Sequence, residues 1–188
     1  SLGTKSLKSN TSGSYNVGIG PYSLCKNSTG NYNVAVGANT LCGNQSGRYN
    51  VSVGYRSLMY NTTGNQNVAL GSRTLMCNTT GGNNIGIGPE TLCNNTTGTN
   101  NIALGLNSLR YNTTGSYNIA LGFNAQSGDF CNSIILGKGA CATGNSQFVL
   151  GSYATPIGNV SSDVESPTHS MEILLNGSIY RILLFTPA

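Results

Sequence analysis

The chain has 188 residues, of which 7% are charged and 38% are apolar, and its formal net charge is +4. This low charge argues against a disordered chain, and the abundance of Asn, Thr and Gly argues against a compact helical domain, because these residues are poor helix formers. No basic run suits nucleic acid and no apolar run is long enough for membrane insertion, so neither partner is expected, and Ser1 does not begin a signal peptide.

A unit of 17 residues repeats from the start of the chain to Thr114. It reads G-x-x-N-[VI]-x-[ILV]-G-x-x-[ST]-L-x-x-N-x-[ST], with six complete copies after Gly13. A constant period of this length predicts an all-β solenoid, in which each repeat forms one coil and neighbouring coils share a core. The first residues fit the second half of a repeat, so the chain begins in mid-coil. Because solenoid ends need caps, we expect further protein before Ser1.

Within each unit, apolar residues alternate with small ones, which predicts a strand with one buried face. We expect Val17 and Ile19 to point into the coil and Gly18 to point outward. Gly20 permits a corner with positive φ, a second short extended piece carries Ser23 and Leu24, and an Asn-x-Thr-Gly turn closes the coil. Two short strands and two corners therefore make one coil.

The small residues at the strand centres form a stripe, which we expect to pack against other copies of the chain. The stripe consists of Gly18, Ala35, Ser52, Ala69, Gly86, Ala103 and Ala120. One coil buries too few aliphatic side chains to offset the entropy of ordering its backbone, so a further buried surface is needed. The two asparagine series are predicted to form ladders of side-chain amides inside the stack.

The period shortens after residue 124. Residues 1–124 form the solenoid of 17-residue repeats, residues 125–152 form shorter coils with glycines 14 apart, and residues 153–170 form a linker. Residues 171–188 are predicted to form a β-hairpin tail with a turn at Asn176-Gly177. Because this hairpin is apolar on both faces, it needs covering by the solenoid or by partner chains.

The six cysteines suggest three disulfides between or within neighbouring coils. Cys25 and Cys42 occupy the same position on adjacent coils, where strands about 4.8 Å apart suit a disulfide. The other proposed pairs are Cys77 with Cys93, one position out of register, and Cys131 with Cys141, which flank the first short coil. Six unpaired thiols are the alternative. The cysteines do not cluster with His169, so no metal site or cofactor is expected.

Two further sets of residues are candidates for contacts with glycans. Tyrosines at one repeat position could present rings to a sugar, although such rows more often stabilise a sheet by stacking; they are Tyr15, Tyr32, Tyr49 and Tyr117. Many repeats also contain N-x-[ST] sequons, which would carry glycans if the chain passed through a secretory pathway. The candidates are Asn27, Asn61, Asn78, Asn95 and Asn112, with the alternative that these are turn and ladder residues.

The 17-residue tandem repeat, with its N-x-A-x-G and N-T-T-G elements, resembles the repeat arrays of phage and giant-virus tail-fibre-like proteins. The shorter coils, with N-S-I-I-L-G and N-S-Q-F-V-L-G, are similar to the head repeats of trimeric autotransporter adhesins. This resemblance covers residues 2–152 and more weakly the tail. It implies a left-handed parallel β-roll, a homotrimer, attachment to a host or surface, and no catalytic residues.

These observations predict a structural or attachment fibre module of a virion or cell surface, outside the cytoplasm, and not an enzyme. The acidic residues are scattered, so a glycosidase pair is not expected. One alternative is an ice-binding solenoid, because threonine rows can form a regular surface. Another is a subunit of a polymeric extracellular filament, which open-ended stacking would permit.

Overall fold

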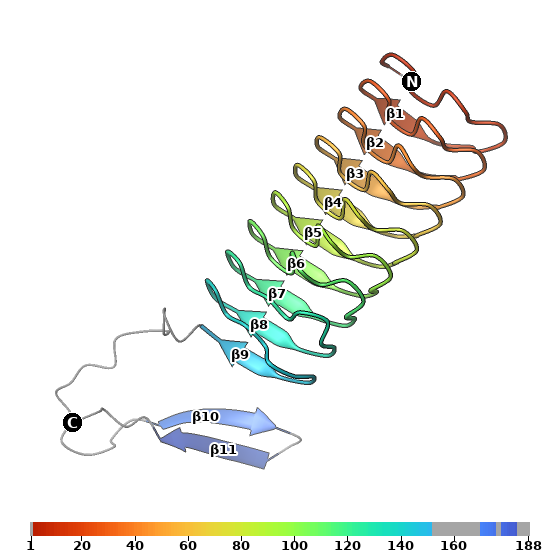
Figure 1. The fold of residues 1–188 in the computed structure, drawn as a ribbon. Coiled ribbons are helices and arrows are strands. Elements are labelled where there is room, and N and C mark those ends of the chain that lie inside the picture. The colour runs from red at the N-terminus through yellow and green to blue at the C-terminus, as the bar shows by residue number, and fades with distance from the viewer. Residues whose placement is uncertain (1, 152–169, 176–177, 184–188) are drawn as a thin grey trace. The chain divides into compact units, whose positions relative to one another are not determined.

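The computed structural model of the chain describes residues 2–151, 170–175 and 178–183. Internal contacts divide the chain into two compact units, Ser1–Thr155 and Pro156–Ala188. In the first unit, nine short strands form one parallel sheet in chain order, which confirms the predicted all-β solenoid (Figure 1). The strands are β1 (Val17–Ile19), β2 (Val34–Val36), β3 (Val51–Val53), β4 (Val68–Leu70), β5 (Ile85–Ile87), β6 (Ile102–Leu104), β7 (Ile119–Leu121), β8 (Ile134–Leu136) and β9 (Phe148–Leu150).

Each 17-residue coil contains one strand, and the rest of the coil is a succession of turns. The predicted second extended piece is therefore wrong: Ser23 and Leu24 lie in a turn, and Leu24 has a φ of 50°. Such left-handed residues cost roughly 1–3 kcal/mol each and persist only where their surroundings hold them. Here the Leu24 N–H donates to the Thr40 carbonyl of the next coil at 3.0 Å, and the pattern recurs along the stack.

The strand centres face the inside of the coil, which reverses the predicted orientation. Ala35, Ala69 and Ala103 have no exposed surface, whereas Val17 is 45% exposed. A Cβ added to Gly18 would lie only 2.6 Å from the Ser6 hydroxyl oxygen, so this position also points into the coil. The small-residue stripe is thus part of the core and cannot be a contact surface between copies.

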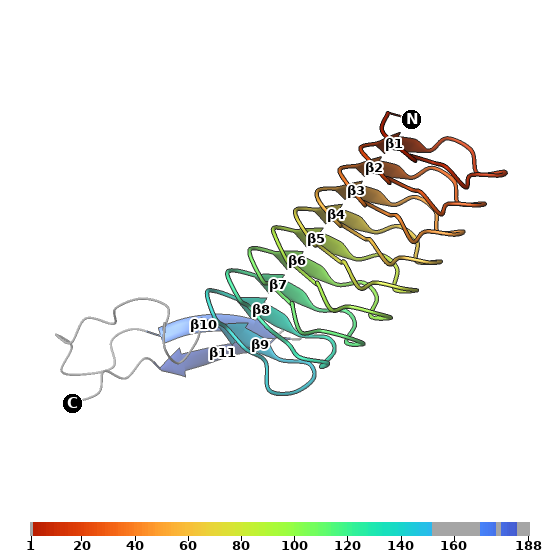
Figure 2. The ribbon, with the colours of Figure 1, turned by 45° about the horizontal axis from the view of Figure 1, so that its top comes forward.

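The core is built from one row of leucines opposite the small strand centres. The row consists of Leu24, Leu41, Leu58, Leu75, Leu92 and Leu109, all fully buried. The glycine that follows each strand, such as Gly37, makes the corner of the coil. Its φ is strongly positive, 133° at Gly37, and glycine adopts this conformation without strain. Figure 2 shows the strands aligned in one wall of the stack.

Two ladders of buried asparagines run along the stack, as predicted. In the first, each side-chain NH₂ donates to the previous side-chain carbonyl; Asn78 donates to Asn61 at 2.8 Å and accepts from Asn95 at 2.8 Å. In the second ladder, Asn67 donates to Asn50 at 3.1 Å through its side chain and at 3.0 Å through its backbone. Buried polar groups must be paired, and these ladders pair them between coils.

The second unit contains two antiparallel strands, β10 (Ser170–Leu175) and β11 (Ser178–Leu183), with Ser170 opposite Leu183. The predicted turn at Asn176-Gly177 and most of the predicted linker lie outside the described residues. The described part of the chain contains no helix long and apolar enough to cross a membrane.

Candidate functional site

The outward side of the parallel sheet is an apolar surface, here called the apolar strand face. Two side-chain rows cover it, one from the first and one from the last residue of each strand. The first row is Val17, Val34, Val51, Val68, Ile85, Ile102, Ile119, Ile134 and Phe148; the second is Ile19, Val36, Val53, Leu70, Ile87, Leu104, Leu121, Leu136 and Leu150. No polar side chain interrupts either row, and all of these side chains are partly or largely exposed.

The apolar strand face is larger than a monomeric protein commonly exposes. Nine strands about 4.8 Å apart span roughly 40 Å, and two rows of side chains cover about 12 Å across, which corresponds to an area on the order of 500 Å². Contiguous apolar patches above a few hundred Å² mark interaction sites. Sequence reasoning missed this surface because it placed these residues in the core.

Three of the four candidate tyrosines form a stack at the edge of the strand wall. The rings of Tyr15 and Tyr32 are 4.9 Å apart and those of Tyr32 and Tyr49 are 5.1 Å apart, and both pairs are nearly parallel. Stacking covers both faces of the Tyr32 ring, so the row presents ring edges and hydroxyls to solvent. Tyr117 lies four coils beyond Tyr49 and is 60% exposed.

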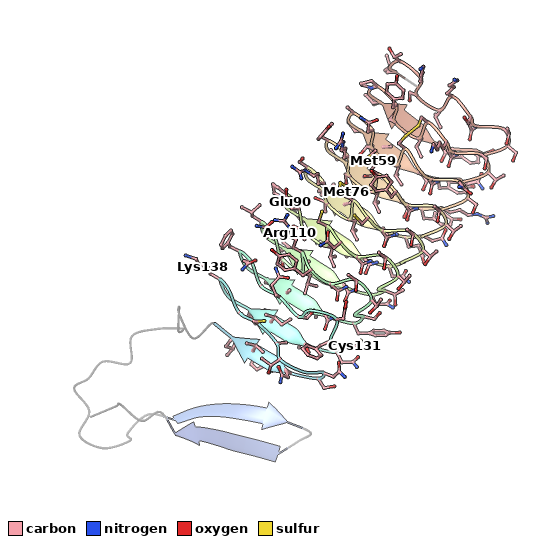
Figure 3. All side chains as sticks on the ribbon, viewed as in Figure 1. Met59, Met76, Glu90, Arg110, Cys131 and Lys138 are labelled. Carbon is pink, nitrogen blue, oxygen red and sulfur yellow. A yellow bond between two sulfur atoms is a disulfide. The ribbon has the colours of Figure 1, made fainter. Side chains whose placement is uncertain are left out.

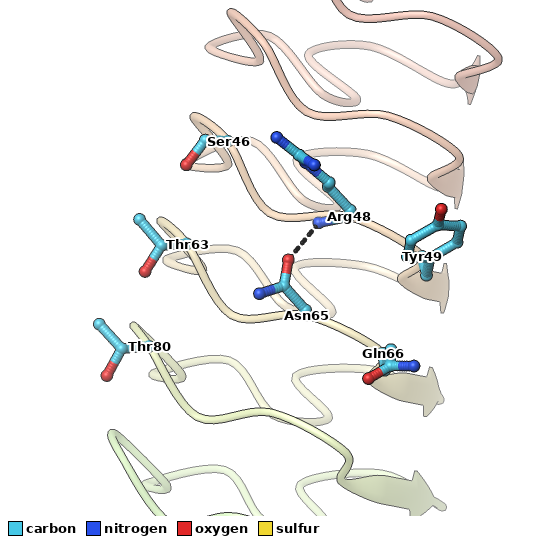
Figure 4. A pocket seen from close by; sticks show the side chains of 7 residues that line it. All are labelled: Ser46, Arg48, Tyr49, Thr63, Asn65, Gln66 and Thr80. Atoms are coloured by element: carbon cyan, nitrogen blue, oxygen red, sulfur yellow. Dashed lines mark hydrogen bonds between the residues drawn. The ribbon is translucent and has the colours of Figure 1, made fainter.

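A shallow hollow lies where the tyrosine stack ends, and we call it the Arg48 hollow (Figure 4). It has a volume of about 610 Å³ and spans three coils. Its lining residues are Ser46, Arg48, Tyr49, Thr63, Asn65, Gln66 and Thr80. The Asn65 side-chain carbonyl accepts from the Arg48 backbone N–H at 2.8 Å, which fixes one wall. The lining of this open hollow therefore combines hydroxyls, amides, a guanidinium and one aromatic ring.

Of the six cysteines, Cys25 and Cys42 are joined by a disulfide, with Cα atoms 4.8 Å apart. The other four are free thiols, so the two remaining predicted pairs are not formed. Cys93 is in register with Met76, the residue before Cys77, and the Cys77 N–H donates to the Cys93 carbonyl at 3.0 Å. Figure 3 labels Met76 and Met59, which continue this row on successive coils.

Burial raises the pKa of the Cys93 thiol, and the neighbouring Cys77 and Glu90 raise it further; burial also raises the pKa of Cys77. Both thiols are thereby less reactive, because the thiolate is the nucleophile. Cys131 and Cys141 make different contacts: the Ser116 N–H of the last 17-residue coil donates to the Cys131 sulfur at 3.3 Å, and the backbone of Cys141 pairs with that of Gln126 in an isolated parallel β-bridge. No group of His, Cys, Asp or Glu in the described ranges could hold a metal ion.

The candidate glycosylation sites all lie in the first asparagine ladder. Asn27, Asn61, Asn78, Asn95 and Asn112 have no exposed surface. The NH₂ group of Asn61 donates both to Asn44 at 2.8 Å and to the Gly64 carbonyl at 3.0 Å, and the other members repeat this arrangement. A glycan on any of these nitrogens would remove a ladder bond and has no space in the coil, which favours the alternative that they are ladder residues.

The threonine rows are partly used inside the turns. The hydroxyls of Thr62, Thr79 and Thr96 donate to the carbonyl one coil further on, at 3.0 to 3.1 Å. Only the following threonines, such as Thr63 and Thr80, are exposed. Each of these turns therefore exposes one threonine of the pair and uses the hydroxyl of the other inside the stack.

Acidic residues with described side chains take part in structural contacts. Glu90 bonds to Arg110 at 2.7 Å and to Arg73 at 3.3 Å (Figure 3). The Asp129 carboxylate accepts bonds from Thr113 and Thr114 in the preceding turn. Asp163, Glu165 and His169 lie outside the described residues.

The fold and these surfaces define a parallel β-solenoid with one apolar wall and a polar hollow beside it. Comparison with protein-family models found no match, and comparisons with curated proteins and with solved structures found none either.

Proposed function

We propose that this solenoid is a rigid module of a homotrimeric attachment fibre on a virion or cell surface, and that the apolar strand face is its subunit interface. The observation that carries the proposal is the uninterrupted pair of exposed aliphatic rows on nine successive strands. The module acts by binding and by supporting the fibre, without catalysis, and the left-handed winding implied by the resemblance is part of the same proposal.

The size of the apolar strand face supports self-association. Two such faces brought together would bury on the order of 1,000 Å², the lower limit for a specific interface. Because identical chains carry identical faces, a closed ring of three chains around an axis parallel to the stack would remove every copy of the face from water. An interface with this composition resembles the core of a domain, as obligate assemblies do.

An extracellular or surface location is supported by the Cys25–Cys42 disulfide, because disulfides persist in oxidising compartments. Attachment to a host or surface glycan is supported by the Arg48 hollow and the tyrosine stack, which offer hydroxyls, amides and an aromatic ring. Rows repeated along each chain and multiplied by three chains would turn weak contacts into firm attachment through avidity.

The mass of the protein in solution, measured by size-exclusion chromatography with light scattering, tests the assembly. We expect three times the chain mass of 19.5 kDa. Ile87→Glu places a charge in the middle of the apolar strand face and should yield monomers. The matched control is Leu106→Glu, because Leu106 is similarly exposed, at 44% against 37% for Ile87, but lies on a turn.

A monodisperse wild-type monomer would refute the proposal. An open-ended series of masses would instead favour the polymeric filament. Loss of assembly in both variants would show that the effect is not specific to the apolar strand face, because the control charge lies on the turn after β6 and not on a strand.

A further inference from the structure

The Arg48 hollow contains a cation that has no ion-pair partner among the described residues. Elsewhere Arg73 and Arg110 bind Glu90, and the Arg56 guanidinium lies 5.0 Å from the centre of the Tyr55 ring. Among the arginines with described side chains, Arg48 alone has neither an acidic partner nor an aromatic ring against its guanidinium. The lining of the hollow also contains no acidic residue.

The hollow also contains an exposed aromatic ring, that of Tyr49. Tyr49 is the last ring of its stack, and the next coil places Gln66 at the equivalent position. Figure 4 shows Tyr49 above Gln66 at the edge of the hollow. Tyr49 is 55% exposed and lines this edge of the hollow beside the Gln66 side chain. One coil further on, Gly82 stands at the position of Arg48 and Asn65, so no side chain fills the space below Asn65.

The remaining lining is rich in groups that both donate and accept hydrogen bonds. Ser46, Thr63 and Thr80 supply hydroxyls at one side, and the side-chain amides of Asn65 and Gln66 lie between them and the strand wall (Figure 4). Hydroxyls and amides match the hydroxyl pattern of a sugar, a guanidinium matches a carboxylate in bidentate geometry, and an aromatic face suits the apolar face of a pyranose ring.

We propose that the Arg48 hollow binds an acidic carbohydrate, specifically a pyranose that carries a carboxylate. The carboxylate pairs with the Arg48 guanidinium, the sugar ring packs against the exposed part of the Tyr49 ring, and the amides of Asn65 and Gln66 bond to its hydroxyls. This proposal names the ligand class for the attachment role proposed above and rests on that role. Because Arg48 and Tyr49 are both largely exposed, a single site is weak, and the assembled fibre gains strength from several copies.

Titration followed by saturation-transfer difference NMR tests the proposal on the full chain. The probes are 3′-sialyllactose and digalacturonate as carboxylated sugars, lactose as the neutral control, and 3′-sulfated lactose to separate sulfate from carboxylate. We expect at least one carboxylated probe to bind about tenfold more tightly than lactose, since a charge-assisted bond is stronger than a neutral one. Equal binding of all four probes, binding of the sulfated probe alone, or no binding would overturn the proposal.

Variants locate the site. Arg48→Ala should weaken binding of the carboxylated probe about tenfold. Arg48→Lys should weaken it less, because lysine keeps the positive charge but cannot donate the two parallel hydrogen bonds of a guanidinium. Arg56→Ala removes another exposed arginine, which does not line the hollow, and should change nothing. Tyr49→Ala should weaken binding, whereas Tyr117→Ala should not. An equal loss in Arg48→Ala and Arg56→Ala would refute the assignment to this hollow.

The two proposals can fail separately. Light scattering on the same samples reports the assembly, which none of these surface changes touches. A trimer that binds lactose as well as the acidic probes would leave the attachment fibre standing and remove its acidic ligand. A monomer that binds the carboxylated probe at Arg48 would support the acidic ligand and refute the trimeric fibre.

Discussion

The 17-residue coils and the shorter coils after Ala125 solve the same packing problem with different residues. In the longer coils, a leucine in the turn fills the interior opposite a small strand centre. In the shorter coils, the strand centre itself is large: Ile135 follows Ala120 in register and is fully buried, and Ala140 and Ala142 belong to the same core cluster. The large core side chain thus comes from the turn in the longer coils and from the strand in the shorter coils. The shorter coils can therefore lack residues in their turns without leaving a void.

The polar interior also changes at this boundary. The second asparagine ladder ends with a partner, because Asn118 accepts from the Ser133 N–H at 3.0 Å. The first ladder ends without one: the Asn112 side-chain oxygen is buried and has no hydrogen-bond donor among the described residues. Gln126 stands 17 residues after Leu109, and its side chain bonds to the Asn107 carbonyl at 2.5 Å instead of continuing the leucine row. An asparagine inside the first ladder should therefore contribute more to the free energy of unfolding than the asparagine at its end.

The largest expected effect is therefore on the ladder. Asn78→Ala removes the donor to the Asn61 oxygen and the acceptor for one of the two N–H bonds of the Asn95 amide, which leaves both of these buried polar atoms without that partner. At about 1–3 kcal/mol for each unpaired group plus the lost side chain, we expect roughly 3–6 kcal/mol of destabilisation in urea titrations followed by circular dichroism. Asn112→Ala is the matched control and should cost less, because the oxygen it removes is already unpaired. Equal destabilisation by the two substitutions would show that the asparagine at the end of the ladder contributes as much as one inside it.

The asparagine ladders, the coil length and the boundary near residue 124 could all be predicted from the sequence, because each is a strict matter of spacing. The orientation of the strands could not. The period-two alternation shows that the side chains of Val17 and Gly18 lie on opposite sides of the strand. It does not show which of the two sides faces the core. The usual assumption that aliphatic residues are buried gave the wrong answer, since the row starting at Leu24 already fills the coil.

The apolar strand face was missed for the same reason, and a contact stripe was predicted in the core. The recurrence of small residues at every strand centre, opposite a leucine at every turn, was the available signal of a narrow coil. The turn backbone was beyond prediction, because Leu24 and its equivalents adopt left-handed conformations that are unusual for a bulky side chain. Bonds between coils stabilise them, and no single repeat contains that information.

The transfer of bulk from turn to strand predicts the next largest effect. Ile135→Ala should destabilise the short coils by about 2–5 kcal/mol, as expected for a large-to-small change in a core. Ala103→Ile should destabilise the longer coils by about 1–3 kcal/mol through overpacking, because a strand centre there faces the leucine of the preceding coil, as Gly86 faces Leu75. Combining Ala103→Ile with Leu92→Ala imitates a short coil and should recover part of the loss. If the destabilisation of the double variant in urea titrations equals the sum of the two single effects, a large strand centre does not compensate for a small residue in the turn.

The disulfide distinguishes the first coils from the last ones. Cys25 and Cys42 close a loop with a sequence separation of 17, for which a stabilisation of about 3 kcal/mol is expected. We expect the Cys25→Ala/Cys42→Ala double variant to unfold at lower urea concentration by that amount, and a reducing agent to have the same effect on the wild type. Cys77→Ala/Cys141→Ala removes two free thiols and should respond to reductant as the wild type does. Mass spectrometry of unreduced peptides checks the pairing directly, and six free thiols would refute it.

The smallest effect concerns the side chain that joins the two kinds of coil. In the longer coils, a backbone carbonyl accepts from the preceding turn; for example, Thr96 accepts from Thr79 and Thr80 at 2.9 and 3.2 Å. The first short coil lacks that carbonyl, and the Asp129 carboxylate takes its place, accepting from the N–H groups of Thr113 and Thr114 at 2.6 and 2.9 Å. Desolvation raises the pKa of Asp129, but the hydrogen bonds from this turn outweigh it and lower the pKa below its usual value.

A folded-state pKa below the unfolded value means that the ionised carboxylate stabilises the fold above the unfolded pKa, near pH 4, and that this contribution is lost as the pH falls through the folded pKa. Because Asp129 is exposed, we expect Asp129→Asn to cost at most about 1 kcal/mol at pH 7. The difference between wild type and variant in urea midpoint should be full at pH 7 and pH 5 and should shrink below pH 4. Glu90→Gln, a carboxylate change away from the boundary, corrects for general acid effects. A difference that stays constant from pH 7 to pH 3 would show that the Asp129 charge does not hold the last long turn.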